Sequence, residues 1–132
     1  MESFVVVSKV KKLIKERQGF NTSQSFFEPL NSDLTSSINQ AIEHATKMNR
    51  KTVMGRDFSF YREMDDVENV LVVASKIKKY IKAKSGLNTS SQVMSQLSIK
   101  VEELCLNAIK NAVENKRKTV MDRDYQSITS LV

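Results

Sequence analysis

The stretch Arg50-Lys51-Thr52-Val53-Met54-Gly55-Arg56-Asp57 decides how this chain is interpreted. It recurs 67 residues later as Arg117-Lys118-Thr119-Val120-Met121-Asp122-Arg123-Asp124. Sliding the chain against itself by 67 residues aligns 7–58 with 74–125 without a gap, and 21 of these 52 positions are identical. Self-similarity at a fixed period indicates a duplicated structural unit. We therefore predict two copies, residues 1–66 and residues 67–132, that together form one compact body.

The identical positions are spread unevenly along the two copies. Ten of them fall in 7–23 and seven in 50–58, and most of these carry basic, amide or hydroxyl side chains. The stretch 24–49 holds only four, all apolar: Leu30, Ala41, Ile42 and Ala45. Two copies that had only to pack would keep apolar positions and let exposed polar ones drift. The retained polar side chains indicate a binding surface, although a recent duplication would leave the same record.

Each copy is predicted to begin with a short amphipathic helix that ends at a glycine. Apolar side chains recur on one face and lysines occupy the other, which is typical of a surface helix. Gly19 and Gly86 supply the left-handed residue that commonly ends such a helix. The apolar face consists of Val6, Val7, Val10, Leu13 and Ile14 in the first copy, and of Val73, Ala74, Ile77, Tyr80 and Ile81 in the second.

A longer helix follows in each copy and carries the predicted core. In the first copy Pro29, which suits a first helical turn, places its start near residue 28, and its end is expected at about Met48. A basic, β-prone pentad then leads to Asp57 and Asp124, each expected to cap a short third helix over 57–64 and 124–131. The predicted core positions are Leu30, Leu34, Ile38, Ala41, Ile42 and Ala45, with Leu97, Val101, Cys105, Ala108, Ile109 and Ala112.

Composition favours an all-α fold. The 132 residues include three glycines and one proline, too few turn-formers to divide the chain into many short strands. One unit is too thin to bury its own long helix, so the two units must clasp each other. The net charge is +6, divided as +1 on residues 1–66 and +5 on residues 67–132, and this excess is compatible with a polyanionic partner.

Several function classes lack residues that could support them. No nucleotide-binding glycine loop, metal-ligand spacing or Ser/His/Asp set is present, so we expect no enzyme activity, catalytic residue, metal, cofactor or small-molecule substrate. His44 is replaced by Asn111 in the second copy, which favours a surface polar residue over a general base. Cys105 lies on the apolar stripe and is expected in the core. With one cysteine and no signal-like or long apolar segment, we expect a cytoplasmic protein without a membrane partner.

The doubled string resembles that of histone-fold proteins of the archaeal and short bacterial type. Arg50 with Asp57 seven residues later, and Arg117 with Asp124, carry the resemblance, which covers nearly the whole chain as two fused folds. It implies two tandem helix-loop-long helix-loop-helix repeats that form an intramolecular handshake, or pseudo-dimer. The first loop of each copy would then lie beside the second loop of the other.

The resemblance also implies which side chains contact DNA. Lysines would contact phosphates as charges, and loop hydroxyl and amide groups as directional partners. Arg50 and Arg117 have two open roles, a phosphate contact or a structural ion pair with Asp57 and Asp124 that braces the loop. The candidate DNA-binding residues are Lys9, Lys12, Asn21, Thr22, Ser23, Arg50, Lys51 and Thr52, with Lys76, Lys79, Asn88, Thr89, Ser90, Arg117, Lys118 and Thr119.

Two features depart from the family pattern. Family members often carry a first-loop arginine that enters the minor groove, whereas 20–22 and 87–89 contain none. The stretch from Gly19 to Arg50 is also shorter than in archaeal members. This difference bears on whether pseudo-dimers of this chain could stack, as the dimers of the family do, into particles that wrap DNA.

Two functions from different classes follow. The first is sequence-tolerant binding of double-stranded DNA through its phosphate backbone, in association with a nucleoid. The second is a histone-fold scaffold that binds protein partners and uses its charge for solubility, and the nearly neutral first copy slightly favours it. The salt dependence of DNA retention separates the two functions.

Overall fold

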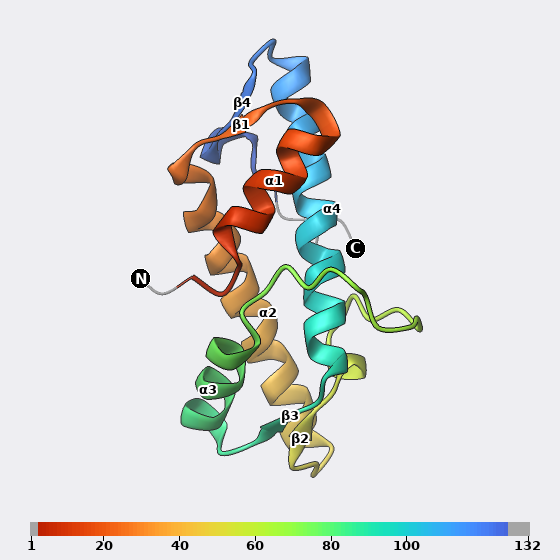
Figure 1. Ribbon diagram of the computed structural model, residues 1–132. Helices are drawn as coiled ribbons and strands as arrows, with labels where there is room; N and C mark the ends of the chain where they lie inside the picture. Colours follow the sequence, from red (N-terminus) through yellow and green to blue (C-terminus); the bar gives the residue numbers. More distant parts are fainter. Residues whose placement is uncertain (1–2, 127–132) are drawn as a thin grey trace.

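The two copies have matching orders of elements in the computed structural model, which describes residues 3–126 (Figure 1). Each has a short helix, a two-residue strand, a long helix, a second two-residue strand and a 3₁₀ turn, and the first copy has an additional 3₁₀ turn before its long helix. The first copy consists of α1 (Val7–Gln18), β1 (Asn21–Thr22), η1 (Gln24–Phe26), α2 (Phe27–Lys47), β2 (Thr52–Val53) and η2 (Gly55–Asp57). The second consists of α3 (Ala74–Ser85), β3 (Asn88–Thr89), α4 (Gln92–Glu114), β4 (Thr119–Val120) and η3 (Asp122–Asp124).

The two short helices end as predicted, each at a glycine in the left-handed region. Gly19 has φ 75° and Gly86 has φ 76°. Their N–H groups donate to the carbonyl oxygens of Lys15 and Lys82, each at 2.8 Å, and so close the last turn. A side chain in this conformation costs about 1 kcal/mol or more, which explains why both copies use glycine here.

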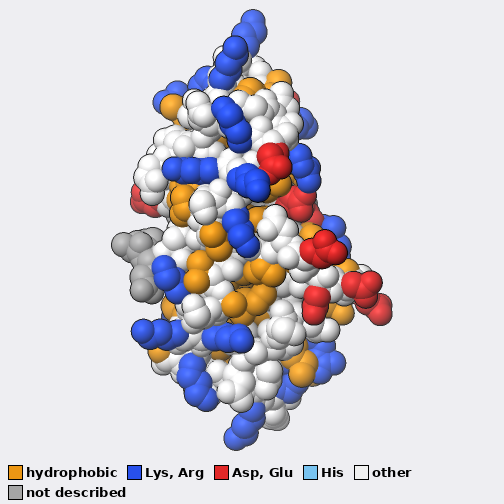
Figure 2. All heavy atoms as spheres, in the orientation of Figure 1, with side chains coloured by type: hydrophobic (Ala, Val, Ile, Leu, Met, Phe, Trp, Pro, Cys, Tyr) orange, Lys and Arg blue, Asp and Glu red, His pale blue; other side chains and the backbone are white. Residues whose placement is uncertain are grey.

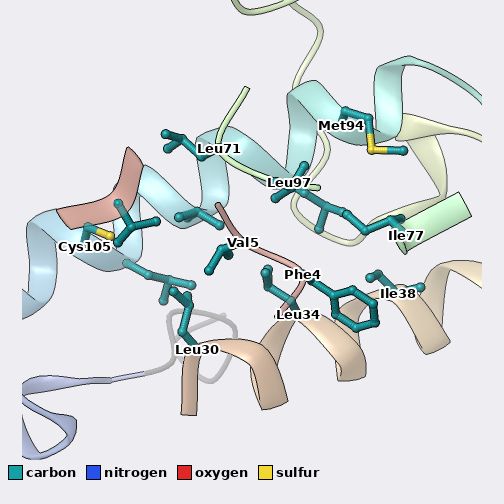
Figure 3. Close-up of a cluster of buried hydrophobic side chains, with 14 of the residues drawn as sticks. Phe4, Val5, Leu30, Leu34, Ile38, Leu71, Ile77, Met94, Leu97 and Cys105 are labelled. Atoms are coloured by element: carbon teal, nitrogen blue, oxygen red, sulfur yellow. The ribbon is translucent and has the colours of Figure 1, made fainter. Parts of the chain in front are cut away.

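The core lies between the two copies, because each short helix packs against the long helix of the other copy. α1 packs on α4, α3 packs on α2, and the long helices also contact each other. Every core position predicted on the two long helices is buried. Figure 3 shows side chains from both copies converging in one cluster, among them Leu34, Ile38, Ile77 and Leu97. Within residues 3–126, none of these helices is long and apolar enough to span a membrane.

A short antiparallel contact joins the segments that precede α1 and α3, and the sequence analysis did not predict it. Val5 forms a β-bridge with Val72. Val6 N–H donates to the carbonyl of Leu71 at 2.8 Å, and Val73 N–H donates to the carbonyl of Phe4 at 2.7 Å. This contact brings the starts of α1 and α3 together between the two copies.

The predicted third helix over 57–64 is wrong. Only the 3₁₀ turn η2 forms there, and Asp57 is its last residue rather than the residue before a helix. Phe58 then adopts extended backbone (φ −82°, ψ 140°) and is only 3% exposed, so its burial directs the chain away from a helical path. In the second copy, η3 and an extended Tyr125 are equivalent, and residues 127–131 of the predicted helix 124–131 lie outside the described residues.

The connection between the copies runs along α4, where side chains of that helix hold its backbone. Gln96 accepts a hydrogen bond from Arg62 N–H at 3.1 Å and donates one to the Arg62 carbonyl at 2.7 Å. Ser95 Oγ accepts from Val67 N–H at 3.1 Å. The joint predicted at Asp65 and Asp66 therefore lies within an anchored segment.

Candidate nucleic-acid interface

Two loop pairs form at opposite ends of the molecule, and each combines loops from both copies (Figure 1). β1 pairs in parallel with β4, and β2 pairs in parallel with β3. Asn21 N–H donates to the Lys118 carbonyl at 3.1 Å, and the equivalent Asn88 N–H donates to the Lys51 carbonyl at 2.9 Å. The structure thus brings first and second loops together in the arrangement that the resemblance implied.

Each second loop is held by an arginine–aspartate ion pair. Arg117 Nη1 and Nη2 lie 2.6 and 2.5 Å from the two carboxylate oxygens of Asp124, and Arg50 forms the same two-point pair with Asp57. Both aspartate side chains are fully buried. A bidentate arginine–carboxylate pair fixes geometry as well as charge. The structure therefore places Arg50 and Arg117 where they brace the loops.

The Asp57 carboxylate is stabilised in its ionised form. Burial acts to raise its pKa, but hydrogen bonds from Arg50, from Met54 N–H and from His44 outweigh burial and lower the pKa from 3.8 to about 2. The pKa of each arginine is raised, because the paired carboxylate stabilises the guanidinium. The loop brace therefore stays charged at neutral pH.

His44 and Asn111 support these braces, which the sequence analysis missed. His44 Nδ1 lies 2.8 Å from Asp57 Oδ1, in a hydrogen bond that the carboxylate accepts. Asn111 Nδ2 donates to the Asp124 carbonyl oxygen at 2.9 Å. The two residues occupy the same position in their copies, 13 residues before the aspartate. That shared offset was the available signal, and it was overlooked because the residue types differ.

Equivalent lysine-lined hollows flank the two loop pairs. One, of about 410 Å³, lies between α1 and β1, and the other, of about 400 Å³, lies between α3 and β3. Each combines three exposed lysines of the short helix with a first-loop asparagine and threonine. The first is lined by Ser8, Lys11, Lys12, Lys15, Phe20, Asn21 and Thr22, and the second by Lys78, Lys79, Lys82, Leu87, Asn88 and Thr89.

The hollows add four lysines to the predicted interface. Lys15 Nζ donates to Asn21 Oδ1 at 3.4 Å, and Lys82 Nζ donates to Asn88 Oδ1 at the same distance. The same hydrogen bond therefore connects the short helix to the first loop in both copies. Lys11 and Lys78 line the same hollows. All four are identical between the copies, and this identity could have singled them out from the sequence.

Two threonine hydroxyls in these hollows have no partner. In the part of the chain that the structure describes, Thr22 Oγ1 and Thr89 Oγ1 are the buried side-chain polar atoms without a hydrogen bond. Buried hydroxyls almost always find a partner, because leaving one unsatisfied costs about 1–3 kcal/mol. The two copies therefore leave the same threonine hydroxyl without a protein partner.

Four other predicted residues have local structural contacts or lie away from the hollows. Ser23 Oγ accepts from Ser25 N–H at 3.3 Å at the start of η1, and Ser90 Oγ accepts from Gln92 N–H at 3.3 Å at the start of α4. Lys9 Nζ donates to the Val70 carbonyl at 3.2 Å beside the segment that precedes α3. Lys9 and its equivalent Lys76 are in the first turns of α1 and α3, outside both hollows.

The second-loop residues of the prediction lie directly opposite the first-loop asparagines. Thr119 pairs with Asn21 across β1 and β4, and Thr52 pairs with Asn88 across β2 and β3. Lys51 and Lys118 precede these threonines and are exposed. Each end of the molecule therefore combines a second-loop lysine with the lysines of a short helix from the other copy.

Positive side chains extend along the whole face shown in Figure 2, and acidic ones gather mainly along one edge. The connection 61–70 carries Glu63, Asp65, Asp66 and Glu68, and it projects on the same side of the molecule in Figure 1. The separation leaves one face with an excess of positive charge. Such a field attracts polyanions and is screened by salt.

Comparisons with known proteins match the fold and not the sequence. No protein-family model matches the chain, and no curated protein sequence matches it. Among solved structures, the histone from Methanopyrus kandleri is similar, with a TM-score of 0.59, 17% identity, and coverage of 91% of this chain and 89% of that chain. The predicted all-α class is confirmed, and the fold of this chain is the histone fold.

Proposed function

We propose that this protein binds double-stranded DNA through the phosphate backbone, with little dependence on sequence, and acts without catalysis to organise a nucleoid or chromatin. The observation that carries the proposal is the pair of equivalent hollows, each with three lysines and a buried, unpartnered threonine hydroxyl. The fold shared with a protein described as a histone agrees with this role. Residues 1–66 and 67–132 would act as two equivalent halves of one binding unit.

The chemistry of each hollow suits a phosphate group. Lysine ammonium groups supply positive charge, and a hydroxyl or an amide N–H supplies a directional donor to a phosphate oxygen. Such contacts fix position on the duplex but carry no direct sequence information. Because the hollows lie beside paired loops at the two ends of the molecule, one duplex lying along the molecule would contact both under this proposal.

A salt series with unrelated duplexes tests the proposal. Each phosphate that the protein neutralises contributes roughly −0.9 to the slope of log K against log salt, so about six contacts give a slope near −5. Gel retardation across the series measures this slope. Binding that does not change between low and moderate salt would contradict the proposal, and no retention at low salt would favour a protein-binding scaffold instead.

A four-alanine variant identifies the surface. Lys51→Ala, Thr52→Ala, Lys118→Ala and Thr119→Ala together should weaken DNA binding at least tenfold and leave the helical melting curve unchanged, because these side chains are exposed or half-buried. A matched control is Arg62→Ala with Lys110→Ala, which removes the same charge from exposed residues that belong neither to the paired strands nor to the linings of the hollows. Equal losses in the two variants would show a nonspecific charge effect.

A further inference from the structure

One buried ion pair joins the two copies at a single repeated position. Asp33 on α2 and Lys100 on α4 are 67 residues apart, so they occupy equivalent places in their copies. Lys100 Nζ lies 3.4 Å from Asp33 Oδ1, and their side chains are only 4% and 9% exposed. Equivalent residues can meet only near the axis that relates two copies. The charges of opposite sign therefore lie at the centre of the interface between the halves.

The side chains that surround this pair also differ between the halves, and each one suits the charge that it contacts. Lys100 Nζ donates to Ser37 Oγ at 2.9 Å, and the residue equivalent to Ser37 is Leu104, which offers no acceptor. The Tyr125 hydroxyl donates to the second carboxylate oxygen of Asp33, and the residue equivalent to Tyr125 is Phe58, which has no hydroxyl. Each charge thus has a partner from the opposite half, and a second copy of its own half would place an apolar side chain there instead.

A pairing of identical halves would place like charges at this point. Two first halves would put Asp33 against Asp33, and two second halves would put Lys100 against Lys100. Burying like charges together is strongly unfavourable, whereas a buried pair of opposite charges adds little net stability over apolar residues. The pair therefore affects the choice of which halves associate, and it contributes little to the free energy of unfolding of the correctly paired fold.

We propose that the Asp33–Lys100 pair makes the interface between the halves selective, so that a first half accepts a second half and rejects another first half. Synthesis gives this selectivity a purpose. The first half leaves the ribosome before the second and exposes an apolar long helix, which a first half of a neighbouring chain could otherwise cover. Rejection of like halves keeps that surface free for the second half of the same chain.

Charge reversals in the full-length chain reproduce each pairing. Lys100→Asp places two carboxylates at the central position, as two first halves would, and Asp33→Lys places two ammonium groups there. The double reversal Asp33→Lys with Lys100→Asp restores opposite signs. The matched control is reversal of Arg17 and Glu102, singly and together, because that pair also joins the copies, at 2.6 Å, but its side chains are 48% and 31% exposed.

Melting curves followed by circular dichroism give the readout. Each single reversal at the centre should lower Tm by at least about 10 °C or prevent folding, and the double reversal should recover more than half of that loss. Reversals of Arg17 and Glu102 should change Tm by no more than about 3 °C. Single central reversals that melt within 3 °C of the unmodified chain, or a double reversal that recovers nothing, would overturn the proposal.

Discussion

At the scale of single residues, Asp57 connects the loop brace to pH. Its pKa is about 2 in the fold and 3.8 ordinarily, so the ionised carboxylate contributes about 2 kcal/mol to stability. Because the folded pKa is the lower one, this contribution is complete above about pH 4 and is lost as the pH falls toward 2. Asp57→Asn should therefore lower Tm at pH 7 and flatten the decline of Tm between pH 4 and pH 2. Asp65→Asn in the exposed connection is the control, and equal pH profiles for the two variants would contradict the assignment.

The unpartnered hydroxyls of Thr22 and Thr89 separate binding from stability. Valine has nearly the same shape as threonine and removes a buried hydroxyl that no protein group satisfies. Thr22→Val with Thr89→Val should therefore leave Tm unchanged or slightly raised, and should weaken DNA binding severalfold if these hydroxyls contact phosphates as proposed. Thr46→Val, whose hydroxyl donates to the Ile42 carbonyl within α2, is the control for binding. Unchanged DNA affinity in the double variant would remove these hydroxyls from the interface.

At the scale of elements, α1 and α3 present the same lysines to equivalent hollows. Lys11→Ala with Lys15→Ala, and Lys78→Ala with Lys82→Ala, should each reduce the magnitude of the salt slope by about 2, because in the proposed binding mode each pair supplies two phosphate contacts. Fluorescence anisotropy with a labelled duplex across a salt series measures the slopes. A slope that changes for one helix and not for the other would contradict the equivalence of the hollows.

The long helices were the most predictable elements, and the ends of the copies the least. The apolar periodicity of α2 and α4 depends on neighbouring residues of one segment, and all of their predicted core positions are buried. The third helix failed because Asp57 also satisfies the Met54 N–H, and because Phe58 enters the core in extended backbone. A local pattern could not show that tertiary contacts outweigh helix formation at that point.

At the scale of the whole molecule, the interlocked packing should make unfolding cooperative. α1 packs on the long helix of the second copy and α3 on that of the first, so neither copy keeps its core alone. We expect a single two-state transition in urea, with coincident curves from circular dichroism and from tyrosine fluorescence. Two separated transitions would show that residues 1–66 and 67–132 are independent units and would contradict the interlocked core.

The candidate site was predicted in part, because only some of its members are neighbours in sequence. The doubled string identified the second loops, and the seven-residue offset identified Arg50 with Asp57 and Arg117 with Asp124 as possible pairs. The hollows were not predictable in the same way, since each is formed where one face of a short helix meets the loop that follows it. Only the fold shows that Lys11 and Lys15 lie together with Asn21 and Thr22.

The sequence by itself determined the duplication, the helical class, the glycine ends and the apolar stripes, because each depends on spacing within one segment. The tertiary structure alone decided the joined starts of α1 and α3, the supporting contacts of His44 and Asn111, and the buried contact of Asp33 with Lys100. Most of these contacts join residues far apart in the chain. Their energies depend on burial and distance in the folded state, and no periodic pattern in the sequence records either quantity.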